Sequence, residues 1–255
     1  MNNIKTFENF NNQDIFTYID NGDIQLVKNY INSGYDLNIQ DNYGDTPLIY
    51  AAINNNCKIV ELLLNAGADP NKKNNNGGTA LIRATYYNNV EVVKLLLNAG
   101  ADIDKQDKNG DTALTRAAYY NNVEIVKLLL NAGVDTNKQD NIGNTALILA
   151  ARKNNVEISR LLLKAGADTD KQDIDSNTAL INSAINNNRE IIELLLDYCA
   201  DEYILNDYNK SFYDFLNTEN QQYFLQKYPT NVYKAIYHEY KKPFTEFIKD
   251  YNVKK

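Results

Sequence analysis

The sequence predicts an all-α repeat protein built from helix–turn–helix units. The main observation is a period of 33 residues: "TPL" begins at Thr46, and "TAL" follows without insertion at Thr79, Thr112, Thr145 and Thr178. Glycine keeps the same period at Gly34, Gly67, Gly100, Gly133 and Gly166. Self-similarity at this period is typical of a solenoid, in which each unit buries its apolar side against its neighbours.

The first helix of each unit is expected to begin just after this threonine. The Thr112 hydroxyl can accept a hydrogen bond from a free backbone N–H of the first turn, and Pro47 suits the same turn because it needs no donor. Leu114, Ala117 and Ala118 then share one face at spacings of three and four. The small alanines predict close approach of a neighbouring helix.

A second helix is expected after an asparagine pair. Asn121 and Asn122 end the first helix, since asparagine adopts the left-handed conformation more readily than other non-glycine residues. The segment "VEIVKLLLNA" carries an apolar face and stops at Gly133. The remaining residues are turn formers, which predict a hairpin leading to the next unit.

The unit from residue 107 to residue 139 resembles an ankyrin repeat. The resemblance implies an ankyrin-repeat solenoid with β-hairpin-like connections and a short helical C-terminal cap. It divides the chain into an N-terminal capping repeat (1–40), five repeats (41–73, 74–106, 107–139, 140–172 and 173–205) and a degenerate repeat with an aromatic-rich helical cap (206–255). The asparagine-rich sequence also resembles ankyrin proteins of large DNA viruses or AT-rich protists.

Two departures from the family pattern carry expectations. The histidine of the family's "TPLH" motif is replaced by Ile49, Ile82, Thr115, Ile148 and Ile181, so apolar packing should take over from the usual hydrogen bonds between threonine and histidine. In the last full repeat Ser176 and Cys199 replace two glycines. We expect that repeat to be distorted.

Composition argues against an enzyme, a cofactor and a metal site. His238 is the only histidine, Cys57 and Cys199 fit no ligand motif, and no phosphate-binding loop motif occurs. A net charge of -7 disfavours nucleic-acid binding, and no apolar run is long enough to span a membrane. We therefore expect a monomeric cytoplasmic or otherwise intracellular protein whose partner is another protein.

The predicted partner-binding residues lie on the exposed side of the first helices, which the family resemblance places on a concave face. Three of the five arginines of the chain fall in this row beside four tyrosines. Tyrosine and arginine are enriched at interface hot spots, and the arginines favour an acidic or phosphorylated segment as the partner. The predicted site consists of Arg83, Tyr86, Tyr87, Arg116, Tyr119, Tyr120, Arg152 and Lys153.

Two alternatives stay open. The tyrosines could have been copied by an internal duplication and serve only to pack across the repeat boundary. Residues 206–255, which hold 13 of the 27 Phe and Tyr residues, could be a cap or a docking segment. The predicted function is a non-catalytic protein-binding scaffold; the alternative is an adaptor that links a target to a ubiquitin-ligase subunit through the C-terminal region.

Overall fold

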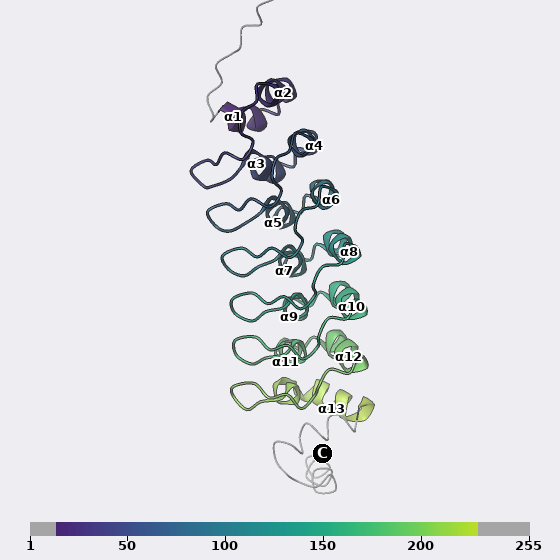
Figure 1. Cartoon of the computed structure of the whole chain (residues 1–255). Coiled ribbons are helices and arrows are strands. Elements are labelled where there is room, and N and C mark those ends of the chain that lie inside the picture. The colour runs from purple at the N-terminus through teal and green to yellow at the C-terminus, as the bar shows by residue number, and fades with distance from the viewer. Residues whose placement is uncertain (1–13, 229–255) are drawn as a thin grey trace, which may run out of the picture. The chain divides into compact units, whose positions relative to one another are not determined.

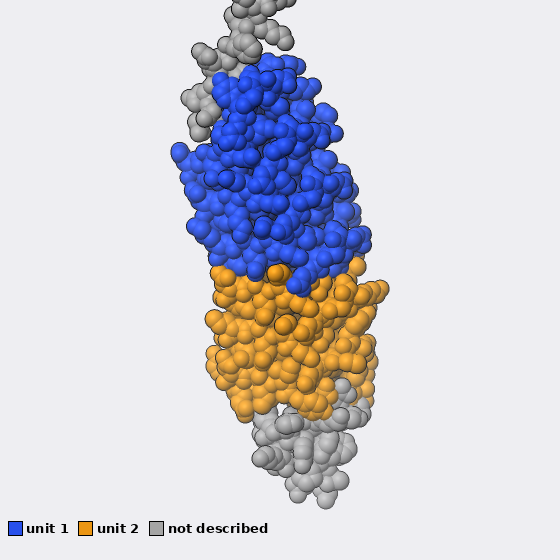
Figure 2. Space-filling model, in the orientation of Figure 1, with its two compact units in different colours: residues 1–135 blue, residues 136–255 orange. Residues whose placement is uncertain are grey.

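The computed structural model describes residues 14–228, and the predictions that concern residues 1–13 and 229–255, including His238, lie outside this part. The chain divides into two compact units, residues 1–135 and 136–255 (Figure 2), and each is described by itself.

The first unit contains helix pairs stacked in two layers (Figure 1). Its first helices are α1 (Asp14–Asp20), α3 (Pro47–Ile53), α5 (Ala80–Tyr86) and α7 (Ala113–Tyr119). Its second helices are α2 (Ile24–Asn32), α4 (Cys57–Asn65), α6 (Val90–Asn98) and α8 (Val123–Asn131). Helices of one layer pack on one another from repeat to repeat, and each first helix packs on the second helix of its own repeat.

The second unit repeats the same arrangement. It contains α9 (Ala146–Arg152) with α10 (Val156–Lys164), then α11 (Ala179–Ile185) with α12 (Arg189–Asp197), then a 3-10 helix η1 (Phe212–Phe215) with α13 (Thr218–Lys227). No strand occurs within residues 14–228. The predicted all-α fold of helix–turn–helix repeats is confirmed.

Threonine side chains cap the first helices as predicted. The hydroxyl of Thr112 accepts a hydrogen bond from the backbone N–H of Thr115 at 3.1 Å, and Thr46, Thr79, Thr145 and Thr178 make the equivalent bond. Four isoleucines at the position of the missing histidine are buried, as the loss of the histidine network predicts. Thr115 differs, because its hydroxyl accepts from the backbone N–H of Thr112 at 2.9 Å, which completes a capping box, and donates to Asp111 at 3.2 Å.

The two asparagines between the helices have separate roles. The first, at Asn55, Asn88, Asn121, Asn154 and Asn187, adopts φ between 54° and 58°, as predicted for a left-handed turn. The second links neighbouring repeats. The side-chain amide of Asn89 donates to the carbonyls of Ala52 (2.8 Å) and Ile53 (3.1 Å) in the preceding repeat, so this asparagine satisfies carbonyls at the end of α3. No local pattern in the sequence indicates this second role.

The hairpins are built from side-chain and backbone hydrogen bonds. Asp107 accepts from the backbone N–H groups of Asn109 (2.8 Å) and Asp111 (3.0 Å), which closes its turn. Within each unit, successive tips are joined by one backbone bond. In the first unit Lys108 donates to the carbonyl of Asn76 at 2.9 Å, and in the second unit Ile174 donates to that of Ile142 at 2.9 Å.

The expected distortion of the repeat at 173–205 is wrong. Ser176 and Cys199 both adopt φ of 59°, the conformation of the glycines that they replace, and α11 and α12 keep the lengths of the other helices. A left-handed serine is strained, but its hydroxyl donates to the carboxylate of Asp207 at 2.5 Å in the next hairpin. This bond offsets part of the strain.

The described part of the C-terminal region packs against the last full repeat. Phe224 of α13 is completely buried, Lys227 forms an ion pair with Glu193 of α12 at 2.8 Å, and the hydroxyl of Tyr228 donates to Asp197 at 3.1 Å. The 3-10 helix η1 packs on α11, so residues up to Tyr228 contact both helices of the last full repeat.

The Asn89 bridge can be tested by Asn89→Ala. The change leaves buried carbonyls of α3 without a donor, so the free energy of unfolding should fall by about 1–3 kcal/mol. Urea denaturation measures it. The matched control is Asn109→Ala at an exposed hairpin tip, and an equal loss in both variants would contradict the assigned role.

The contact between Glu193 and Lys227 predicts a pH dependence. Burial alone would raise the pKa of Glu193, but hydrogen bonds from Lys227 and Tyr223 lower the pKa below its ordinary value. A lowered pKa in the folded state means that Glu193 stabilises the protein above its unfolded-state pKa and loses this effect as the pH falls through the folded-state pKa.

The stability advantage of the wild type over Glu193→Gln, measured by urea denaturation, should therefore be full at pH 7 and should shrink below about pH 4.3. The same change at Glu219, whose side chain is 80% exposed, is the control and should have little effect at either pH. An advantage that does not change with pH would contradict the assignment.

Candidate protein-binding surface

The local helix geometry brings six of the eight predicted residues together in the first unit. Arg83 and Tyr86 lie on α5 and Tyr87 caps it, while Arg116 and Tyr119 lie on α7 and Tyr120 caps it. The small residues between them face inward and are buried. Spacing of three and four therefore leaves arginine and tyrosine on the opposite side of each helix.

Four tyrosines form one connected cluster, which we call the tyrosine cluster. The ring centroids of Tyr86 and Tyr87 lie 5.1 Å apart, those of Tyr119 and Tyr120 lie 4.9 Å apart, and all contacts are edge-to-face. Tyr86 and Tyr120 join the two repeats at 5.1 Å. This geometry is typical of favourable aromatic pairs, so packing across the repeat boundary is part of what these residues do.

The tyrosine cluster also remains open to solvent. The exposed fraction is 39% for Tyr86, 46% for Tyr87, 40% for Tyr119 and 41% for Tyr120. Burial raises the pKa of Tyr120, and a hydrogen bond with Tyr86 raises it further, so the Tyr120 hydroxyl stays protonated and uncharged near neutral pH. The cluster offers ring faces together with neutral donors and acceptors.

Arg116 is held by two carboxylates of its own repeat. Its guanidinium lies 3.0 Å from Asp107 and 2.8 Å from Asp111, and the side chain as a whole is 22% exposed. Burial alone would lower the pKa of Arg116, but the hydrogen bond with Asp107 and the charge of Asp111 raise it. The charge of this arginine is thus neutralised inside the protein.

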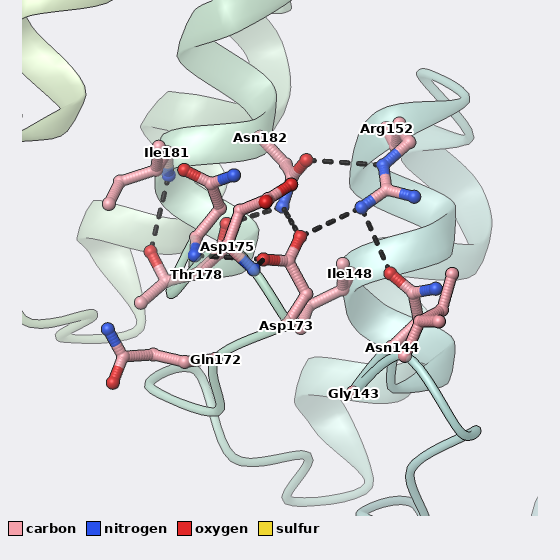
Figure 3. Close-up of polar contacts among 12 residues, drawn as sticks. Gly143, Asn144, Ile148, Arg152, Gln172, Asp173, Asp175, Thr178, Ile181 and Asn182 are labelled. Carbon is pink, nitrogen blue, oxygen red and sulfur yellow. Dashed lines mark hydrogen bonds and ion pairs between the residues drawn. The ribbon is translucent and has the colours of Figure 1, made fainter. Parts of the chain in front are cut away.

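Arg152 in the second unit is also engaged (Figure 3). Its guanidinium donates to Asp173 at 2.9 Å, to Asn144 at 2.9 Å and to Asn182 at 3.2 Å, and the side chain of Asp173 is only 3% exposed. Lys153 follows it as the C-cap of α9 and is exposed. These two residues belong to the second unit and are not assigned to the tyrosine cluster.

The predicted binding surface is therefore less positively charged than expected from the sequence. Two of the three arginines have carboxylate partners, which the sequence analysis missed. A signal was present for Arg116, because aspartates stand nine and five positions before it. Arg83 alone of the three makes no ion pair within residues 14–228; its guanidinium carbon lies 5.6 Å and 5.4 Å from the ring centroids of Tyr86 and Tyr87.

A family model for ankyrin repeats in three copies matches residues 15–107 and 99–173, which together cover more than half of the sequence. The chain belongs to the ankyrin-repeat family. Ankyrin repeats form a typical non-enzymatic interaction domain, and ankyrin-repeat domains bind protein partners.

A solved ankyrin structure agrees with this assignment. The crystal structure of the ankyrin repeat domain of Bcl-3, described as a unique member of the IkappaB protein family, is 27% identical to this chain. The match covers 83% of this chain and 97% of the Bcl-3 domain, with a TM-score of 0.76. The sequence matches no curated protein.

Neither a membrane span nor a metal cluster is found in the described residues. No helix within residues 14–228 is long and apolar enough to cross a membrane. The same part of the chain brings no three His, Cys, Asp or Glu side chains together in a way that could hold a metal ion.

Arg116→Ala should destabilise this ankyrin domain. The change leaves Asp107 and Asp111 facing each other without a cation, so the free energy of unfolding should fall by about 1–3 kcal/mol. Thermal melting checks it. Arg160→Ala is the control, because the Arg160 pair with Glu190 is long, at 3.7 Å, and exposed; equal melting temperatures for Arg116→Ala and the wild type would refute a structural role for Arg116.

Proposed function

We propose that this chain is a non-catalytic ankyrin scaffold that binds a partner protein through the tyrosine cluster and Arg83. The observation that carries the proposal is that the fold does not require tyrosine at these positions. Ile53 and Asn54 occupy the equivalent places in the first unit, and Ile185 and Asn186 in the second, with the same helix length and cap.

The chemistry of the tyrosine cluster suits protein recognition. Tyrosine contributes a large contact area with few rotatable bonds and adds a directional hydroxyl, which is why it is enriched at binding hot spots. Packing among the four rings restrains them before a partner arrives, so less conformational entropy is lost on binding.

We also propose which kind of segment the partner presents. An acidic or phosphorylated segment is favoured by Arg83, whereas Arg116 and Arg152 contribute less because carboxylates of the protein already hold them. The resemblance to asparagine-rich ankyrin proteins of large DNA viruses or AT-rich protists adds the proposal that the partner is a host protein.

The adaptor function stays a prediction on residues 206–255. What supports a cap for residues 206–228 is the packing of η1 on α11 together with the ion pair of Lys227 with Glu193 of α12. Residues 229–255 lie outside the described part. We therefore place target binding on the tyrosine cluster and assign no ligase contact.

The proposal is tested with Tyr87→Ala/Tyr119→Ala in the full chain. These rings are the two ends of the cluster, so the pair Tyr86–Tyr120 that joins the repeats is kept. Affinity purification from cell extract with mass spectrometry identifies the partner, and titration of that partner should show at least about tenfold weaker binding, since hot-spot truncation costs about 2 kcal/mol or more.

Two controls make the test specific. Tyr43→Ala removes a tyrosine that is 75% exposed at a hairpin tip of the same unit and should leave binding unchanged. Tyr87→Phe/Tyr119→Phe keeps the rings and separates the contribution of the hydroxyls. Full binding by a folded Tyr87→Ala/Tyr119→Ala protein would show that the partner binds elsewhere.

A further inference from the structure

Arg83 and Arg116 occupy the same position in successive repeats, but their surroundings differ. Arg116 lies between the carboxylates of Asp107 and Asp111, at nine and five positions before it. At the same two places before Arg83 stand Asn74 and Gly78. The repeat of Arg83 therefore has the arginine but neither of the two carboxylates that hold Arg116.

The two hairpins have the same backbone geometry. Asn74 donates to the carbonyl of Gly78 at 2.9 Å, and Gly78 donates to the side chain of Asn74 at 2.8 Å. The equivalent bonds of Asp107 and Asp111 measure 2.9 Å and 3.0 Å. Gly78 therefore occupies the place beside Arg83 that Asp111 occupies beside Arg116, but it has no carboxylate.

The present contacts of Arg83 leave its charge without a direct partner. The guanidinium lies against the rings of Tyr86 and Tyr87, and no ion pair of Arg83 is found in the described part of the chain. Its Nε–H is buried and has no acceptor, which is costly for a donor on a charged group. Asp45 of the preceding hairpin instead accepts a hydrogen bond from the side chain of Asn74 at 2.7 Å.

A small cavity opens beside this guanidinium. It has a volume of about 50 Å³, and Gly78, Arg83, Tyr86 and Arg116 are among the residues that line it. Space of this order admits one or two waters, or a group as small as a carboxylate. Asp107 lines the same cavity, and its charge disfavours a dianionic phosphate more strongly than a carboxylate.

We infer that Arg83 binds a carboxylate of the partner protein, from an aspartate or glutamate side chain that takes the position held by Asp111 beside Arg116. The inference rests on the proposed function of the tyrosine cluster and adds the chemistry of one partner residue to it. Tyr86 and Tyr87 flank the carboxylate, and Arg83 makes the acidic residue the specificity determinant of the bound segment.

Gly78 allows the inference to be tested without removing Arg83. Its φ is not in the left-handed region, so other residues can adopt its backbone conformation. A Cβ at Gly78 would lie 3.2 Å from Cδ of Arg83, a contact that the flexible arginine stem can relieve. Gly78→Asp should form an ion pair with Arg83 within the chain, and Gly78→Ala is the control, because it adds the Cβ but leaves the position of the carboxylate open.

The experiment selects 12-residue peptides from a displayed random library on the wild-type full chain, and each selected peptide is then titrated against the variants. We expect the peptides to share an Asp or Glu whose change to Asn or Gln weakens binding to the wild type by about tenfold or more. Gly78→Asp should abolish this preference, whereas Gly78→Ala should retain it. Thermal melting checks that both variants are folded.

The other outcomes overturn the inference in distinguishable ways. Peptides that depend on Tyr87 and Tyr119 but show no acidic preference would leave the proposed function standing and remove the role of Arg83. Equal binding of an acidic peptide to Gly78→Asp and the wild type would do the same. A phosphoserine peptide that binds about tenfold tighter than its glutamate form would replace the carboxylate by a phosphate. A library that yields no binding peptide would count against the proposed function as well.

Discussion

Burial of each repeat against the next is the constraint on which the rest of this protein depends. A pair of helices of seven and nine residues is too short to be stable alone, and each has an apolar face that only a neighbour can cover. Ala51 and Ala52 on α3, like Ala117 and Ala118 on α7, are fully buried, because residues of this size let the first helices of neighbouring repeats pack closely. The exposed positions on these helices are less constrained by this burial, so their side chains can differ from repeat to repeat.

Polar groups at the repeat boundary are satisfied by the same neighbour. Asn89 and Asn122 donate to carbonyls at the ends of the preceding first helices, and Asn71 accepts from the backbone N–H of Asp102 at 2.7 Å. In the second unit Asn137 accepts from Asp168 at 2.8 Å in the same way. Side chains of one repeat thus form the hydrogen bonds that water would otherwise make to the backbone of another repeat. The asparagines at these positions therefore have a structural role.

Local rules account for the features that could be predicted from the sequence alone. Thr112 as a cap, Asn121 in a left-handed turn and the buried face of Ala117 depend on neighbours three or four positions away, and the period of 33 residues extends each rule to every repeat. The spacing of Asp107 and Asp111 before Arg116 is a signal for that ion pair. The partner of Arg152 could not be predicted in this way, because Asp173 lies in the next repeat and the contact depends on rotamers and on packing between repeats. The expected distortion at Ser176 is wrong for a similar reason. The hydrogen bond that offsets the backbone strain of Ser176 is made to Asp207, which lies in the next hairpin.

The single backbone bond between successive hairpin tips has a consequence for how this protein can change in evolution. In the first unit Asn75 and Lys108 each donate to the tip before them, and in the second unit Ile174 and Asp207 do so. One residue inserted into a tip would misalign that bond with both adjacent hairpins. Loops that in most proteins diversify by changing length are held here to one length, so new specificity must arise through side-chain identity at fixed positions.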